Sequence, residues 1–575
     1  MLEGAFASAN APAKLAWLLA HQYSPAGLGF AGLKGADAAL ARVLRQAAGR
    51  AGCAVHLGIV HIEESGPAQP DCSAYERRGR RRYHDYGDEE IEEDASGDDF
   101  EVIEVSDASW KIDQWVDAQD GPAEFGPVPL AEGELLPAGA LDHEAPDEQR
   151  LLEATGNEGA SFERAYHRAA FVLWPRDRSL TVLLQAGVAA ALPALEQRVR
   201  ALDRAADPER ERAAAIAGAQ QILDAWEVSP EQWQHRIGRK EPDRGAMVAL
   251  LGRLGDAELL ERFLSGVLAG LFDGSENDAL AAHLPRLGAE RAGRALERLA
   301  RDGALRMPGP CVDLLGRLLR GLGERRTAEW IAAFHPTAAV LVETLPQMGT
   351  GADTDAPDRR WSEPARRPAD ATLISGLLDS LRVLGAAELR MQAAAAIVAD
   401  AAAFDPVETV VPALKTLAGD LRTEWADDTE AGRLWRHAAE FVLGRSEFPP
   451  APPADWRQAV KIDCTCADCR ELQAFASDPA AQVHRFRVRL DRRRHLHEQI
   501  RRHGLDMTHE TERRGSPQTL VCTKTRAAYR RACARHHADC AAMRTLLEAG
   551  GPAGGGALAA RLATAGERRP AVSAE

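Results

Sequence analysis

The feature that most constrains the fold is a long run of segments, over residues 176–447, in which apolar residues recur at helical spacing. Each segment is about 10–20 residues long and ends at a short break of Gly, Pro or Asp. Every such segment has one apolar face to bury. A paired-helix solenoid of the HEAT kind buries these faces by stacking neighbours, and a compact helical bundle buries them as well. The sequence has no clean period that separates the two, so we predict a mostly α chain with a helical-repeat or helical-bundle middle.

The N-terminal region, residues 1–175, has both helix-like and strand-like patterns, so we predict an α+β fold for it. Alanine-rich stretches predict helices over residues 11–21 and 34–50. Apolar stretches rich in Val, Ile, Phe and Trp predict strands, and these cover residues 54–62, 100–105, 110–116 and 167–175. Between them lies a charged insertion near residues 66–99, where a basic block is followed by an acidic run. Opposite charge blocks without apolar residues cannot form a core, so we expect this insertion to be disordered.

The C-terminal fifth begins at a proline cluster, residues 448–455, which predicts a stiff linker. We expect a small unit over residues 456–550 after it. The last stretch, residues 551–575, is rich in Gly, Ala and Pro, and we expect it to be disordered.

Cysteine is concentrated in this small unit, which holds six of the nine in the chain. Cys466 and Cys469 form a C-x-x-C pair, a spacing that lets two thiolates bind one tetrahedral Zn²⁺, and Cys464 can supply a third ligand. The fourth ligand is to be chosen from His484, His495, His497 and Cys522. We favour His495, because it lies on a predicted helix that can fold back on the cysteine turn. Free thiols in a small core and a redox dithiol are the two alternatives to a structural zinc.

Arginine is also concentrated near this motif, between residues 485 and 502. Such a patch can meet phosphates, but it can equally be a solvated helix face. The whole chain has a net charge of −16, which disfavours non-specific nucleic-acid binding. We therefore expect a protein partner ahead of nucleic acid. No apolar stretch is long enough for a transmembrane helix, so we expect no membrane partner. The clustered cysteines favour a cytoplasmic location.

A complete catalytic constellation is not found in the sequence. P-loop, G-x-S-x-G and H-E-x-x-H motifs are absent. Non-haem iron chemistry needs His-x-Asp and a distant His. The only His-x-Asp is His537-Ala538-Asp539, in a helical segment with no His after it. His61-Ile62-Glu63 is a Glu variant on a predicted strand, and it lacks a convincing partner.

Three groups of motifs follow one another along the chain. The first is Leu33-Lys34-Gly35-Ala36-Asp37 after His21-Gln22-Tyr23-Ser24, and the second is Gly156-Asn157-Glu158-Gly159 before the stretch AYHRAAFVLWP, residues 165–175. The third is Asp463-Cys464-Thr465-Cys466-Ala467-Asp468-Cys469, followed by Arg494-His495-Leu496 and by TLVCTKT, residues 519–525. In this order they resemble the long C-terminal portion of prolyl-4-hydroxylase-like 2-oxoglutarate/Fe(II) oxygenases.

The resemblance implies a catalytic double-stranded β-helix toward the N-terminus, with His-x-Asp, a distal His and a basic residue for 2-oxoglutarate. None of these matches a position here, so the resemblance assigns no catalytic or cofactor-binding residue. Fe(II) and 2-oxoglutarate are implied only if a catalytic domain is supplied elsewhere. Our first hypothesis is therefore a non-catalytic accessory or scaffold region. The alternatives are an oxygenase whose catalytic domain lies outside this chain, and a nucleic-acid-binding module that uses the arginine patch.

Overall fold

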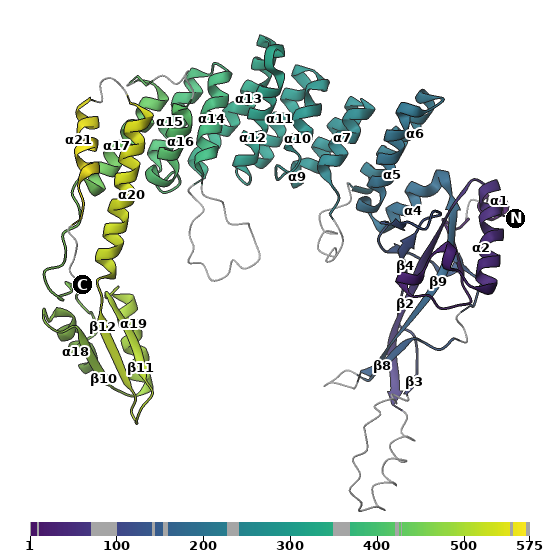
Figure 1. Cartoon of the computed structure of the whole chain (residues 1–575), viewed down its shortest axis with the longest axis horizontal. Helices are drawn as coiled ribbons and strands as arrows, with labels where there is room; N and C mark the ends of the chain where they lie inside the picture. The colour runs from purple at the N-terminus through teal and green to yellow at the C-terminus, as the bar shows by residue number, and fades with distance from the viewer. Residues whose placement is uncertain are drawn as a thin grey trace, which may run out of the picture. The chain divides into compact units, whose positions relative to one another are not determined.

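The computed structural model describes residues 2–7, 11–70, 100–140, 144–152, 159–226, 241–348, 369–419, 425–426, 428–551 and 556–570 (Figure 1). The chain divides into two compact units, Met1–Leu268 and Ala269–Glu575. The predicted fold class is confirmed: the chain is mostly α, with an α+β region at the N-terminus and a cysteine cluster near the C-terminus. None of the described helices is both long and apolar enough to cross a membrane.

A mixed sheet forms the centre of the N-terminal region. Its two longest strands, β2 (Cys53–Pro70) and β9 (Ser161–Pro175), pair antiparallel along most of their length, from Cys53 opposite Pro175 to Pro67 opposite Ser161. The strand order is β5-β4-β2-β9-β1-β7, and β3, β6 and β8 pair with β2, β4 and β9. The other strands are β1 (Leu15–Leu18), β3 (Phe100–Val102), β4 (Asp107–Val116), β5 (Pro122–Ala123), β6 (Val128–Pro129), β7 (Leu135–Leu136) and β8 (Glu148–Leu152).

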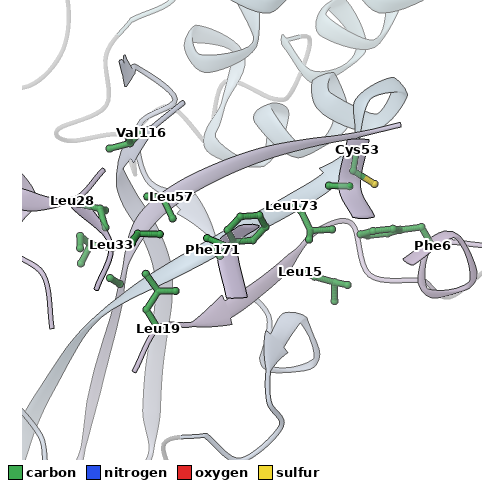
Figure 2. Close-up of a cluster of buried hydrophobic side chains, with 14 residues drawn as sticks. Phe6, Leu15, Leu19, Leu28, Leu33, Cys53, Leu57, Val116, Phe171 and Leu173 are labelled. Atoms are coloured by element: carbon green, nitrogen blue, oxygen red, sulfur yellow. The ribbon is translucent and has the colours of Figure 1, made fainter. Parts of the chain in front are cut away.

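Apolar residues alternate along β2 and β9, so that each face of the sheet buries its own cluster. Leu57, Phe171 and Leu173 belong to one cluster, which Figure 2 shows, and helix α2 (Gly35–Arg50) contributes Ala41 and Ala48 to it. The other cluster includes Trp115 and Trp174. The predicted helix over residues 34–50 is thus confirmed, as are the predicted strands within β2, β4 and β9. Of the strand predicted over residues 100–105, only residues 100–102 form one, as β3.

Two expectations for this region are wrong. Residues 11–21 do not form a helix, because Leu15–Leu18 is strand β1, between β9 and β7. A short apolar run that is covered on both faces has no clear period, so it can be read as a helix. The disorder expected near residues 66–99 is also wrong for the first residues of that range, because residues 66–70 continue β2 and pair with β3 and β9. Its remaining part, residues 71–99, lies outside the described residues.

Helices follow the sheet along the chain. In the first unit these are α4 (Ser179–Ala186), α5 (Val188–Ala201), α6 (Pro208–Trp226), α7 (Arg244–Leu254) and α8 (Ala257–Phe263), and a short helix α1 (Leu2–Ala5) lies near the N-terminus. The second unit continues with α9 (Ala269–Leu271), α10 (Asn277–His283), α11 (Ala289–Gly303), α12 (Pro308–Leu322), α13 (Ala328–Thr344), α14 (Ala371–Val383), α15 (Ala387–Ala399), α16 (Val411–Ala418) and α17 (Glu430–Ser446).

Each helix of the second unit packs mainly on the helix two places further along the chain, so the helices form two rows. Helix α11 packs on α13, α12 on α14, α14 on α16 and α15 on α17. The helices differ in length, with 7 residues in α10 and 17 in α13, and no fixed repeat length is shown within the described part of the chain. The HEAT-like repeat therefore stays a prediction.

The small C-terminal unit follows the proline cluster, and residues 448–455 lie in neither helix nor strand. It contains α18 (Ala467–Ser477), β10 (Val483–Arg487), α19 (Leu490–Arg502), β11 (Met507–Glu512) and β12 (Thr519–Lys524). The strands form an antiparallel sheet in the order β10-β12-β11. Its core is one cluster that includes Phe475, Phe486, Leu496 and Leu520.

The predicted end of this unit needs two corrections. Helix α20 (Ala527–Ala549) lies inside the predicted range 456–550, yet it packs on α16 and α17, and Trp435 Nε1 donates to the carbonyl of Leu546 at 3.0 Å. The tail, residues 551–575, contains helix α21 (Gly556–Glu567), which packs on α20, instead of being disordered throughout. Its Ala and Leu residues are strong helix formers, and Leu562 and Ala565 are buried. Residues 552–555 and 571–575 lie outside the described residues.

Candidate metal centre

The cysteine motif folds around the start of helix α18. Cys466 is the N-cap residue, and its Sγ accepts a hydrogen bond from the backbone N–H of Cys469 at 3.4 Å. Cys469 is in the first turn and is fully buried, whereas Cys464 lies just before the helix and is partly exposed. The C-x-x-C spacing therefore places two sulfur atoms beside each other at a helix N-terminus, with the third sulfur next to them.

His495, on the neighbouring helix α19, completes the group. Its Nε2 lies 3.4 Å from the sulfur of Cys464, 3.7 Å from that of Cys466 and 3.2 Å from that of Cys469. All four ligand atoms lie within 4.8 Å of one another. Within the described ranges, this is the one group of three or more His, Cys, Asp or Glu side chains that could hold a metal ion.

These distances match a tetrahedral site closely. With Zn–S near 2.3 Å and Zn–N near 2.0 Å, the sulfur-to-nitrogen edge of the tetrahedron is about 3.5 Å. Hydrogen bonding alone does not explain the arrangement, because one imidazole nitrogen carries at most one hydrogen and cannot donate to three sulfurs. A cation at the centre would contact all four atoms.

Local interactions shift the pKa values of two of the thiols in opposite directions. The backbone N–H of Cys469 lowers the pKa of the Cys466 thiol to about 7, which increases its thiolate fraction near neutral pH. Burial raises the pKa of Cys469, because a thiolate there would be desolvated. A metal ion would reverse this second effect, since it binds and stabilises the deprotonated sulfur.

An ion pair between Asp468 and Arg492 joins α18 to α19, next to the candidate ligands. The Arg492 guanidinium donates two hydrogen bonds to the Asp468 carboxylate, one of them from Nε at 2.6 Å. Asp468 lies between Cys466 and Cys469, and Arg492 is one turn before His495, so the pair fixes the cysteine turn against α19. Sequence reasoning missed this role, because it counted Arg492 only as part of the basic patch. The i, i+3 spacing of Arg492 and His495 on a helix was the available signal.

The other candidates for the fourth ligand do not join the group. His484 Nε2 lies 2.8 Å from Glu471 Oε1. Cys522 is buried in the core on β12, where burial raises the pKa of its thiol to about 12. His497 packs edge-to-face on His509, with 4.3 Å between ring centroids. Of the four candidates, only His495 reaches the cysteines.

The His-x-Glu stretch on β2 makes other contacts. His61 Nε2 lies 2.7 Å from Asp113 Oδ1, and Glu63 accepts from Lys111 at 2.7 Å. His167 is the register partner of His61, with 4.7 Å between ring centroids. Glu63 and His167 line an open hollow of about 650 Å³ whose lining does not include His61. These side chains are not among the described groups that could hold a metal ion.

His56 on β2 and Asp539 on α20 have structural roles. His56 stacks on Trp174 at 4.6 Å, and burial lowers its pKa to about 4, so the ring is neutral at pH 7. Asp539, from the sequence His537-Ala538-Asp539, is buried and accepts hydrogen bonds from Arg445 and Ser446.

Residues His21, Tyr23 and Asp37 of the first motif form one hydrogen-bonded group. The Asp37 carboxylate is buried at the start of α2 and accepts from Ala20 N, His21 N, His21 Nδ1 and Tyr23 Oη at 2.8–3.0 Å. Burial alone would raise the pKa of Asp37, but these hydrogen bonds outweigh it and lower the pKa below its usual value. Of the second motif, Gly156, Asn157 and Glu158 lie outside the described residues.

No protein-family model matches the chain, and no match was found among the curated proteins or the solved structures.

Proposed function

We propose that this chain is a non-catalytic binding scaffold in which one zinc ion, held by Cys464, Cys466, Cys469 and His495, closes the C-terminal unit. The single observation that carries the proposal is the approach of three sulfur atoms to one imidazole nitrogen at 3.2–3.7 Å. Three thiolates and one imidazole are a common ligand set of structural zinc.

The composition of the group supports a structural role over a catalytic one. Catalytic zinc keeps one of its four positions open for water or substrate, whereas here protein side chains supply all four ligands. A redox dithiol would use Cys466 and Cys469 and give no role to Cys464 or His495. Free thiols in a core would not gather around one nitrogen atom.

The surroundings of the site support a scaffold. The zinc would join α18 to α19 and so stabilise a small unit next to two rows of helices, and such rows present extended surfaces to other proteins. We infer a protein partner, which the resemblance would make a separately encoded oxygenase domain. Turnover of 2-oxoglutarate by the purified chain with Fe(II) would contradict the non-catalytic role.

The metal content tests the proposal directly. We expect about one zinc per chain after purification without added metal, and a lower melting temperature in the presence of a chelator. The double variant Cys53→Ala/Cys311→Ala is a matched control, because it removes two buried thiols outside the group and should keep its zinc. Less than about a tenth of a zinc per chain, with unchanged melting in chelator, would reject the proposal.

A further inference from the structure

The C-terminal unit differs in charge from the rest of the chain. Residues 456–526, which precede α20, contain 15 Lys and Arg against 9 Asp and Glu, a net charge of +6, whereas the whole chain has −16. A basic unit within an acidic protein concentrates positive potential on one part of its surface, where it attracts anionic partners.

Several arginines of this unit are used within the fold. Arg493 is buried and donates to the carbonyl of Val488 at 2.8 Å and to Gln518 Oε1 at 2.9 Å. Arg492 pairs with Asp468, and Arg485 pairs with Glu512. These three side chains therefore already have partners within the unit.

Three other arginines line one open pocket of about 770 Å³. It is formed by α19, the start of β11 and the start of α20, the elements labelled in Figure 1. Arg494 and Arg501 lie seven residues apart, on the same side of α19, and Arg531 reaches the pocket from α20. All three are exposed, and none has an ion pair or hydrogen bond with the part of the chain that the structure describes.

The negative charge in the pocket is smaller. Asp506 lines the pocket, but its carboxylate accepts from Thr525 Oγ1 and from the backbone N–H groups of Ala527 and Ala528. Glu498 is the other acid in the lining. Three guanidinium groups against two carboxylates leave the pocket with a net charge of +1.

The rest of the lining suits a flat, partly apolar group. Ile500, Leu505 and Met507 supply apolar surface, and the paired rings of His497 and His509 also line the pocket. His497 Nε2 and His509 Nδ1 are buried and have no hydrogen-bond partner in the described structure. Nucleobases stack on such rings and apolar surfaces, while arginine binds the phosphates beside them.

From this combination we propose that the pocket binds one nucleotide of a single-stranded nucleic acid, with its phosphates on Arg494, Arg501 and Arg531 and its base near His497 and His509. Exposed arginines continue beyond the pocket on the same two helices, at Arg502, Arg530 and Arg535, so a strand has further contacts that a free nucleotide lacks.

Binding of a fluorescein-labelled oligonucleotide of about 12 nucleotides to the full chain tests the proposal by fluorescence anisotropy. We expect Arg494→Ala/Arg501→Ala to weaken binding by at least about tenfold. The slope of log affinity against log salt should fall by about 1.4, because two phosphate contacts to a single strand are lost. The control Arg42→Ala/Arg50→Ala removes two exposed arginines from α2, with the same change in net charge, and should bind like the wild type.

Zinc content is measured on the same samples, so a loss of binding is distinguished from a loss of the metal site. No binding of the oligonucleotide at low salt would overturn the proposal. Equal weakening by the pocket and control variants would also overturn it, because the effect would then come from net charge alone. Tighter binding of the matching duplex would overturn the single-strand assignment.

Discussion

The N-terminal sheet and the small C-terminal unit differ in how much apolar core they bury. The sheet buries an apolar cluster on each face, and these clusters include large side chains such as Phe171 and Trp174. The C-terminal unit has one cluster, to which a sheet of three short strands and the helices α18 and α19 contribute. Small units bury a smaller fraction of their surface, so they often need a metal or another cross-link. The comparison supports the proposal that a metal stabilises the unit with the smaller core.

Substitution of Cys469 by Ser should have the largest effect and should be confined to the C-terminal unit. It removes a buried ligand, so the unit loses its zinc and with it stabilisation on the order of 10 kcal/mol. Hydrogen exchange of the full chain should show lost protection over α18, α19 and β10–β12, with β2 and β9 unchanged. Full protection of α19 in this variant would contradict the assigned role of the metal.

Substitution of Phe171 by Ala should give the opposite pattern. Its ring is fully buried in the cluster on the α2 side of the sheet, so we expect a loss of about 3–5 kcal/mol in the stability of the first unit. The zinc content should stay at that of the wild type. Loss of zinc in Phe171→Ala, measured by elemental analysis, would show that the two regions do not fold independently.

Substitution of Asp37 by Asn should cost the first unit about 1–3 kcal/mol at neutral pH, because a buried, hydrogen-bonded carboxylate is replaced. The pKa of Asp37 is lowered in the folded state, so the carboxylate stabilises the fold above its unfolded pKa of about 4. That contribution is lost as the pH falls through the folded pKa. Urea unfolding at several pH values should therefore show the difference between the two proteins shrinking below about pH 4. A difference that does not change with pH would contradict this role.

Substitution of Arg492 by Gln should have the smallest effect, because the ion pair with Asp468 is half-exposed on the arginine side. We expect the zinc to remain bound and to be released to a colorimetric chelator faster than from the wild type, by less than about tenfold. Arg494→Gln, two residues along α19, is the control and should release zinc at the wild-type rate. Equal rates of zinc release for all three proteins would show that Arg492 does not stabilise the site.

The sequence was informative where a pattern has a single physical interpretation. Partial alternation over residues 54–62 and the apolar run over residues 167–175 predicted the strands within β2 and β9, and the spacing of Cys466 and Cys469 predicted a cysteine cluster that could hold a metal. His495 could be favoured because it lies on a predicted helix, now α19, that can fold back on the cysteine turn. Leu15–Leu18 was misread, because a short apolar run fits a buried strand and a helix equally well. The Asp468–Arg492 pair and the pocket of Arg494, Arg501 and Arg531 depend on tertiary packing between elements, which neither spacing nor composition encodes.

The most direct test is X-ray absorption at the zinc edge of the full chain, purified without added metal. We expect a four-coordinate shell of three sulfur atoms near 2.3 Å and one nitrogen near 2.0 Å. In His495→Ala the nitrogen should be lost or replaced by a solvent oxygen, while the sulfur shell stays. A sample without zinc, or a shell of nitrogen and oxygen with no sulfur, would contradict it.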